Sequence, residues 1–174
     1  MNTIKYKKIP FWLIMIVAFL VSAGMISLSW SQHTHHHFHC RISGIAQNAS
    51  AEAYFRLDSN ATMLMYTLKV NNIENITMAH VHLGMPGDIN SPVVWLYPSS
   101  PPPKPIPGSF SGILAEGTIT AEDLIGPLRG EPLSVLLGHM QKDHTFVNIH
   151  TQDHPQGAIC GKVQLFDGER SLQE

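Results

Sequence analysis

The sequence of 174 residues is poor in charge and in cysteine, and it contains no internal repeat. Charged residues make up 14%, and the formal net charge of −2 excludes a disordered polyelectrolyte. From Gln32 onward, 8 basic and 13 acidic residues give 8 − 13 = −5, so this part lacks the basic surface of a nucleic-acid-binding protein. The sequence also lacks a Ser/His/Asp arrangement, a phosphate-binding loop and paired catalytic carboxylates, so it gives no indication of a hydrolase or a kinase.

A single long apolar run is present, which excludes a multi-span membrane protein. Residues 11–30 are broken only by Ser and Gly, and three lysines precede them within the first ten residues. Such an arrangement is typical of a secretory signal or of one membrane anchor, whose twenty helical residues at about 1.5 Å each would cross the hydrocarbon core. Ser29 and Ser31 have the spacing that a signal peptidase requires before Gln32. We expect residues 1–31 to be a signal peptide or an N-terminal anchor, and the remainder to lie outside the cytoplasm.

The two cysteines, Cys40 and Cys160, are 160 − 40 = 120 positions apart. Disulfides persist in exported proteins. A disulfide between these two cysteines would close most of the domain into a loop and stabilise the folded state by about 4–5 kcal/mol in the chain-entropy model. We therefore predict a Cys40–Cys160 disulfide between the first and last strands, with two free buried thiols as the alternative. Three Asn-x-Ser/Thr triplets, at Asn48, Asn60 and Asn75, are compatible with export.

Apolar and polar residues alternate over short segments in the exported part. Leu64, Tyr66, Leu68 and Val70, for example, would share one face of a strand. Turn-forming residues separate these segments, a pattern typical of an antiparallel sandwich or barrel. We expect strands within residues 38–46, 50–58, 62–70, 76–84, 91–97, 110–119, 145–151 and 157–166.

Between the predicted strands lie two helical signals and one proline-rich segment. Thr120–Asp123 resembles a capping box, and Pro132 suits the first turn of a helix through Met140. Residues 98–108 cannot donate regular ladder hydrogen bonds and should form an extended loop. The predicted fold is all-β, a single antiparallel Greek-key-like sandwich or barrel with one or two short helices in a long connection. The expected division is a leader (residues 1–31), a histidine-rich linker (32–39), the β domain (40–167) and a polar tail (168–174).

All 11 histidines follow residue 32, and they form two groups. The first is a tract that would capture metal ions even without a fixed structure, although adventitious binding by a polar linker explains it equally; it consists of His33, His35, His36, His37 and His39. In the second group, His80 and His82 would share one face of a strand, and His150 on another strand is a candidate third ligand. His144 and His154 flank that strand and are candidates for a fourth. The alternative is a set of structural histidines that hydrogen-bond to the backbone.

Several segments resemble the CHRD domain, which is named after chordin. Its closing signature, an Asn-Val-His-Thr run leading into Gly-Glu-Ile-Arg-Gly, is similar to FVNIHTQDHPQGAICGKV at residues 146–163, except that Ala158 and Cys160 replace the usual Glu and Arg. The resemblance covers about residues 38–166 in order. Its central signature is similar to MAHVHLGMPGD (residues 78–88), SPVVWL (91–96) and GTITAEDL (117–124).

The resemblance implies an extracellular all-β module with an extracellular protein as a candidate partner. Its recurrent histidines match His80, His82 and His150, which favours a site for Cu or Zn. A fainter similarity connects the His-Val-His strand and the late Ala-Cys-Gly strand with Cu/Zn superoxide dismutase. Three functions therefore stand: an exported module that binds Cu or Zn, a copper-dependent dismutase-like enzyme, and a structural or adhesive surface domain. Nucleic acid is not expected as a partner, and membrane contact would occur only through residues 11–30, if they are not cleaved.

Overall fold

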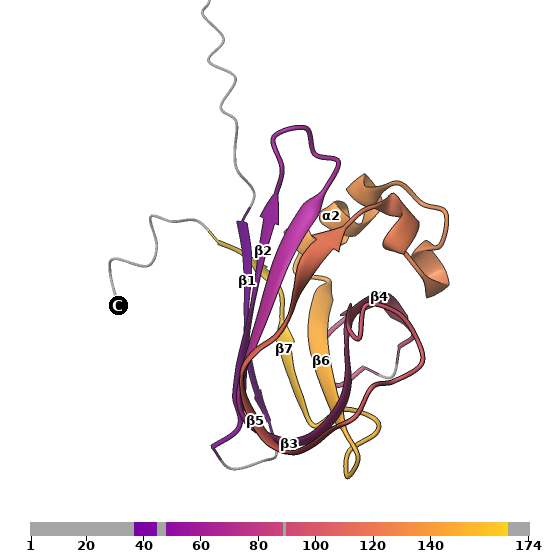
Figure 1. Ribbon diagram of the computed structural model, residues 1–174. Helices are drawn as coiled ribbons and strands as arrows, with labels where there is room; N and C mark the ends of the chain where they lie inside the picture. The colour runs from indigo at the N-terminus through magenta and orange to yellow at the C-terminus, as the bar shows by residue number, and fades with distance from the viewer. Residues whose placement is uncertain (1–36, 45–47, 89, 167–174) are drawn as a thin grey trace, which may run out of the picture. The chain divides into compact units, whose positions relative to one another are not determined.

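The computed structural model describes residues 37–44, 48–88 and 90–166 (Figure 1). The predicted leader and the predicted tail lie outside these residues. Within the described ranges, no helix is long and apolar enough to cross a membrane. The strands are β1 (His37–Gly44), β2 (Ser50–Leu57), β3 (Leu64–Leu83), β4 (Pro92–Tyr97), β5 (Ile106–Ile119), β6 (Thr145–Thr151), β7 (Ile159–Lys162) and β8 (Gln164–Leu165).

Five strands form a closed antiparallel ring, in the order β1-β2-β3-β6-β7 with β7 pairing back to β1. Three further strands extend it, because β4 and β5 pair with β3 and β8 pairs with β1. The prediction of a mostly β, antiparallel fold is confirmed, and the closed ring makes it a barrel. The alternation of buried and exposed residues in β2 and in the first half of β3 reflects one face toward the core and one toward solvent.

The long strand β3 joins two segments that the sequence predicts as separate strands. Asn72, which is typical of a turn, and Asn75 have φ angles of 54° and 51°, and Asn tolerates this left-handed region better than most residues. The register against β5 shifts on both sides of Ile73, so these residues form bulges within a continuous strand. As a result, the first half of β3 pairs with β2, and the second half pairs with β6 and β4.

One α-helix, α2 (Leu133–Gln141), occurs in the described part of the chain and lies near one end of the barrel (Figure 1). Its buried residues, which include Leu136 and Met140, belong to the barrel core. Pro132 is its N-cap, close to the predicted start. The predicted capping box is confirmed at η1 (Ala121–Asp123), where Thr120 N donates to Asp123 Oδ2 over 2.8 Å. A second 3-10 turn, η2 (Gly126–Leu128), follows.

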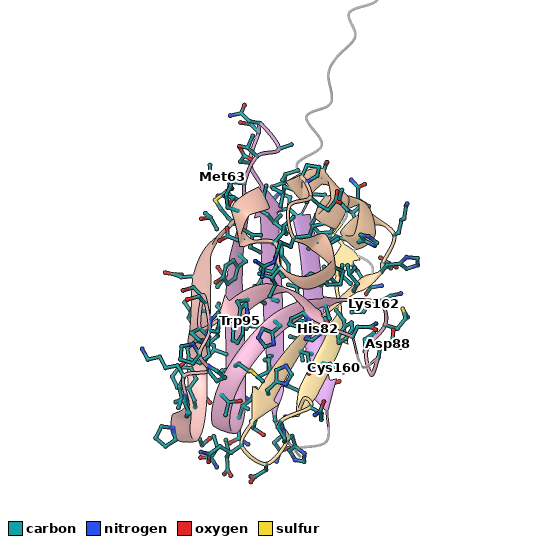
Figure 2. All side chains as sticks on the ribbon, turned by 90° about the vertical axis from the view of Figure 1, so that its right-hand side faces the viewer. Met63, His82, Asp88, Trp95, Cys160 and Lys162 are labelled. Atoms are coloured by element: carbon teal, nitrogen blue, oxygen red, sulfur yellow. The ribbon has the colours of Figure 1, made fainter. Side chains whose placement is uncertain are left out.

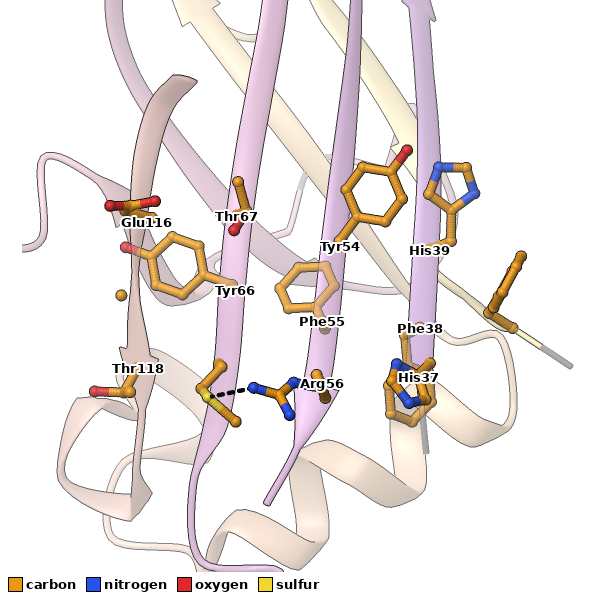
Figure 3. A pocket seen from close by; sticks show the side chains of 13 residues that line it. His37, Phe38, His39, Tyr54, Phe55, Arg56, Tyr66, Thr67, Glu116 and Thr118 are labelled. Atoms are coloured by element: carbon orange, nitrogen blue, oxygen red, sulfur yellow. Dashed lines mark hydrogen bonds between the residues drawn. The ribbon is translucent and has the colours of Figure 1, made fainter. Parts of the chain in front are cut away.

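The predicted histidine-rich linker at residues 32–39 ends too late. Strand β1 begins at His37, and Phe38 is 1% exposed, so the last three residues of the tract belong to the barrel. His39 stacks on Tyr54 with ring centroids 4.7 Å apart (Figure 3). His39 is therefore packed on the sheet rather than held in a free chelating tract. His33, His35 and His36 lie outside the described residues.

The predicted Cys40–Cys160 disulfide is not formed in the structure, where both residues are free thiols. Cys40 is 1% exposed and belongs to the core. In β7, Ile159 and Gly161 are buried whereas Cys160 between them is only half-buried, so Cys160 faces the other side of the barrel wall. Cys160 pairs in register with Ser43, not with Cys40. Burial raises the pKa of the Cys40 thiol to about 12, which leaves it unreactive at neutral pH.

Candidate metal centre

Three histidines converge on the outer side of the barrel wall, opposite the core. His80 and His82 alternate along β3 with Ala79 and Val81, which are core residues. His150 on β6 pairs in register with Met78, two residue pairs along from His80. One nitrogen from each of the three imidazoles lies within 4.8 Å of the others. The exposed fractions of His80, His82 and His150 are 3%, 6% and 6%.

The histidines line a pocket of about 470 Å³ between β3, β4, β6, β7 and the loops that follow β3 and β6. Figure 2 shows His82, Asp88, Trp95 and Cys160 on this side of the barrel. Asp88 is the one carboxylate among the described residues that line the pocket. Its Oδ2 accepts a hydrogen bond from Met85 N over 2.7 Å, so this carboxylate stabilises the loop after β3.

Backbone carbonyl groups orient two of the imidazoles. His82 Nδ1 lies 2.8 Å from Asn90 O, and His150 Nδ1 lies 2.9 Å from Pro155 O. Because a carbonyl oxygen only accepts, both Nδ1 atoms carry the hydrogen, and both Nε2 atoms present a lone pair. An Nδ1–H bonded to a backbone carbonyl is the usual arrangement behind a metal-binding Nε2.

The third imidazole, His80, completes the group. Its Nδ1 donates a hydrogen bond to His150 Nε2 over 3.2 Å, which leaves the lone pair on His80 Nε2. Within the described residues, the Nε2 atoms of His80 and His82 are buried without a hydrogen-bond partner. Buried polar atoms are rarely left unpaired, so this donor set fits a metal ion.

The surroundings keep these imidazoles neutral and fixed. Burial, followed by the charges that His150 and His82 would carry, lowers the pKa of His80 to about 3. Burial also lowers the pKa of His82 and of His150, against the carbonyl hydrogen bonds that raise it. Trp95 packs edge-on against His80 with centroids 4.1 Å apart, and Phe146 stacks on His82 at 5.1 Å. Neutral imidazole is the form that binds metals.

The family model of the CHRD domain matches residues 41–163, from β1 to the residue after β7. The chain belongs to the CHRD family. No curated protein and no solved structure matches it. The matched segment of this CHRD domain contains the whole pocket, because β3, β4, β6 and β7 all lie within it.

The predicted fourth ligands of the CHRD site, His144 and His154, lie outside the group of three. Both side chains are exposed. His144 lines a different pocket together with His139. His154 lies in the turn after β6, where its backbone N donates to Thr151 Oγ1 over 3.1 Å and its carbonyl accepts from Gly157 N. Proximity to His150 in sequence does not bring either imidazole into the pocket.

Sequence reasoning missed three residues that shape the pocket. Met78 lies two positions before His80 and therefore shares its strand face, so the alternation rule was enough to find it. Cys160 was assigned to a disulfide. The role of Asn90 is carried by its backbone carbonyl, which no side-chain pattern indicates.

Proposed function

We propose that this CHRD domain binds one Cu or Zn ion through His80, His82 and His150. The observation that supports the proposal is the convergence of three buried imidazoles, two of which have an unpaired Nε2. Imidazole is a ligand for zinc and copper, whereas Mg²⁺ and Ca²⁺ require sets of oxygen atoms. Three protein ligands would leave one position of a four-coordinate ion for another group.

We also propose that the domain acts outside the cytoplasm, as its family and the apolar residues 11–30 indicate. The N-terminus would be a cleaved signal or a retained anchor. An extracellular protein remains the expected macromolecular partner. Cell fractionation with detection of the C-terminus tests this location, and a cytoplasmic pool of the intact chain would contradict it.

The metal proposal is tested by the content of the purified chain after loading with Zn(II) or Cu(II) and dialysis against a weak chelator. His80→Gln and His82→Gln should each remove about one equivalent. His144→Gln and His154→Gln are matched controls, because they remove exposed imidazoles outside the pocket. Equal metal content in all four variants would favour a surface domain without an ordered site.

Stability gives a second readout of the same site. An ion that binds only the folded state raises the free energy of unfolding by RT ln(1 + [L]/Kd), about 2.7 kcal/mol at a hundredfold excess over Kd. Zn(II) should therefore raise the thermal midpoint of the wild type and of His154→Gln, but not that of His82→Gln. A midpoint that does not respond to saturating metal in the wild type contradicts the proposal.

A further inference from the structure

Two sulfur atoms belong to the pocket of the three histidines. Met78 lies on the same face of β3 as His80 and directly opposite His150 in the β3–β6 register. Cys160 enters from β7, where it pairs with Asn148, the residue that itself pairs with His80. Both sulfur side chains are half-buried, so they are accessible from the pocket side.

The barrel wall explains why Cys160 is a free thiol. Its side chain faces the pocket while Cys40 faces the core, so these two thiols are separated by the sheet. Cys160 is not part of the tight group that His80, His82 and His150 form. A thiol at this position is available to an ion that enters the pocket.

We propose that the pocket takes the soft monovalent ion Cu(I), with Met78 and Cys160 supplying sulfur ligands beside the imidazoles. This inference rests on the proposed function and names the ion of the same site. A thioether is a ligand of Cu(I) but not a usual ligand of Zn(II), whereas a thiolate binds both ions, so Met78 is the residue that favours Cu(I). The pocket's carboxylate, Asp88, lies outside the group of three histidines and accepts a hydrogen bond from Met85 N.

Met78 is the nearer of the two sulfur donors by register. Residues paired directly across an antiparallel ladder have Cβ atoms about 4.5–5.5 Å apart, and the three rotatable bonds of Met allow its sulfur to reach the ring of its partner. Cys160 lies one strand beyond, on β7, where it lines the pocket outside the group of three imidazoles. The arrangement suits an exchangeable ion that passes between sulfur and nitrogen ligands.

The experiment compares Cu(I) and Zn(II) affinities of the full chain under anaerobic conditions, by competition with chromogenic chelators. His33, His35 and His36 are replaced by Ala in every sample so that they do not contribute. In that background, Met78→Leu should weaken Cu(I) binding at least about tenfold, the effect that even outer-shell partners have on metal affinity, and Cys160→Ser should weaken it further. The Zn(II) affinity of the Met78→Leu variant should change less than about twofold, because a thioether is not a usual zinc ligand. Ag(I), which does not change oxidation state, should follow Cu(I).

Matched controls exist for both sulfur atoms. Met85→Leu alters an exposed methionine that lines another pocket, and Cys40→Ala removes the core thiol; neither should change Cu(I) affinity. X-ray absorption of the Cu(I)-loaded chain should show a copper–sulfur shell that the Met78→Leu, Cys160→Ser variant loses.

The outcomes separate this inference from the proposed function. In one outcome, His80→Gln abolishes Zn(II) binding, but the Cu(I) affinity is the same with and without the two sulfur atoms. This outcome would refute the inference and leave the proposed metal site intact. Failure of both ions to bind in a His80-dependent way would refute both. Loss of Cu(I) affinity without loss of Zn(II) affinity supports both.

Discussion

Acidification should destabilise the metal-free domain well above the pH at which carboxylates protonate. Burial holds the pKa of His80 at about 3 in the folded state, against 6.5 for an ordinary histidine. Between these values, the unfolded chain binds a proton that the folded chain does not. The free energy of unfolding is therefore fully present above pH 6.5 and falls as the pH is lowered toward 3. His82 and His150 change it in the same direction, because burial lowers their pKa values as well.

The size of the effect follows from the shift. One pKa unit corresponds to about 1.4 kcal/mol. The difference between 6.5 and about 3 for His80 alone therefore lowers the free energy of unfolding by about 2 kcal/mol at pH 5 and by about 4 kcal/mol at pH 3. Small domains are stable by about 5–15 kcal/mol. The titration of one imidazole is thus a large fraction of the total stability.

The assay is urea unfolding of the chelator-treated chain at several pH values from 7.5 to 4.5. His80→Gln cannot take up this proton, so its stability should depend less on pH than that of the wild type. His144→Gln, at an exposed position outside the pocket, should show the wild-type dependence. Identical pH dependence in the wild type and in His80→Gln over this range would refute the assignment of the burial effect to His80.

Three further predictions concern the barrel, the thiols and the reaction chemistry. Gly161→Ala places a Cβ against Arg41 O and within 2.9 Å of Cys40 Sγ. The substitution should separate β1 from β7 and lower the free energy of unfolding by at least about 1–3 kcal/mol in urea titrations. Unchanged stability would contradict the close β1–β7 contact. Thiol titration of the native, unreduced chain should find Cys160 reactive and Cys40 protected, with two thiols after denaturation; no thiol after denaturation would instead show the disulfide. The copper-loaded chain should dismutate superoxide no faster than free copper. Superoxide is an anion, and Lys162, the cation of β7, is already paired with Asp143 at 3.4 Å. Fast activity that is lost in His80→Gln would favour the dismutase-like enzyme.

Most of the strands could be predicted from sequence because alternation is local. β2, β4 and β6 begin and end within about two residues of the expected positions, and in β2 the alternation of the sequence reappears as period-two burial. The strand expected from residue 38 begins at His37, whereas the linker boundary at residue 39 was placed too late because polar histidines flank Phe38. The sequence predicts two strands in place of the continuous β3, because the positive φ of Asn72 occurs both in turns and in bulges. Sandwich and barrel could not be separated, since closure depends on the pairing of β7 with β1.

The candidate site was predictable only in part for a similar reason. That His80 and His82 share a face follows from the strand alone. That His150 joins them depends on the β3–β6 register, which no local pattern specifies, and there the family resemblance supplied the link. His154 and Cys160 show the opposite case. Each was assigned a partner from its place in the sequence, but Cys160 faces away from the core in which Cys40 lies, and the exposed His154 lies outside the group of three.

The burial of both faces of β6 is what favours a binding function over a structural one. All seven residues of this strand are buried, although only one face contacts the apolar core. A strand covered on its second face by packing alone would carry apolar residues there, yet beside Phe146 this face carries Asn148 and His150 and lies against His80. A buried nitrogen left without a partner costs about 1–3 kcal/mol, and of the three such imidazole nitrogens among the described residues, those of His80 and His82 lie in this pocket. An ion that joins these nitrogens removes that cost, which a purely structural role leaves unexplained.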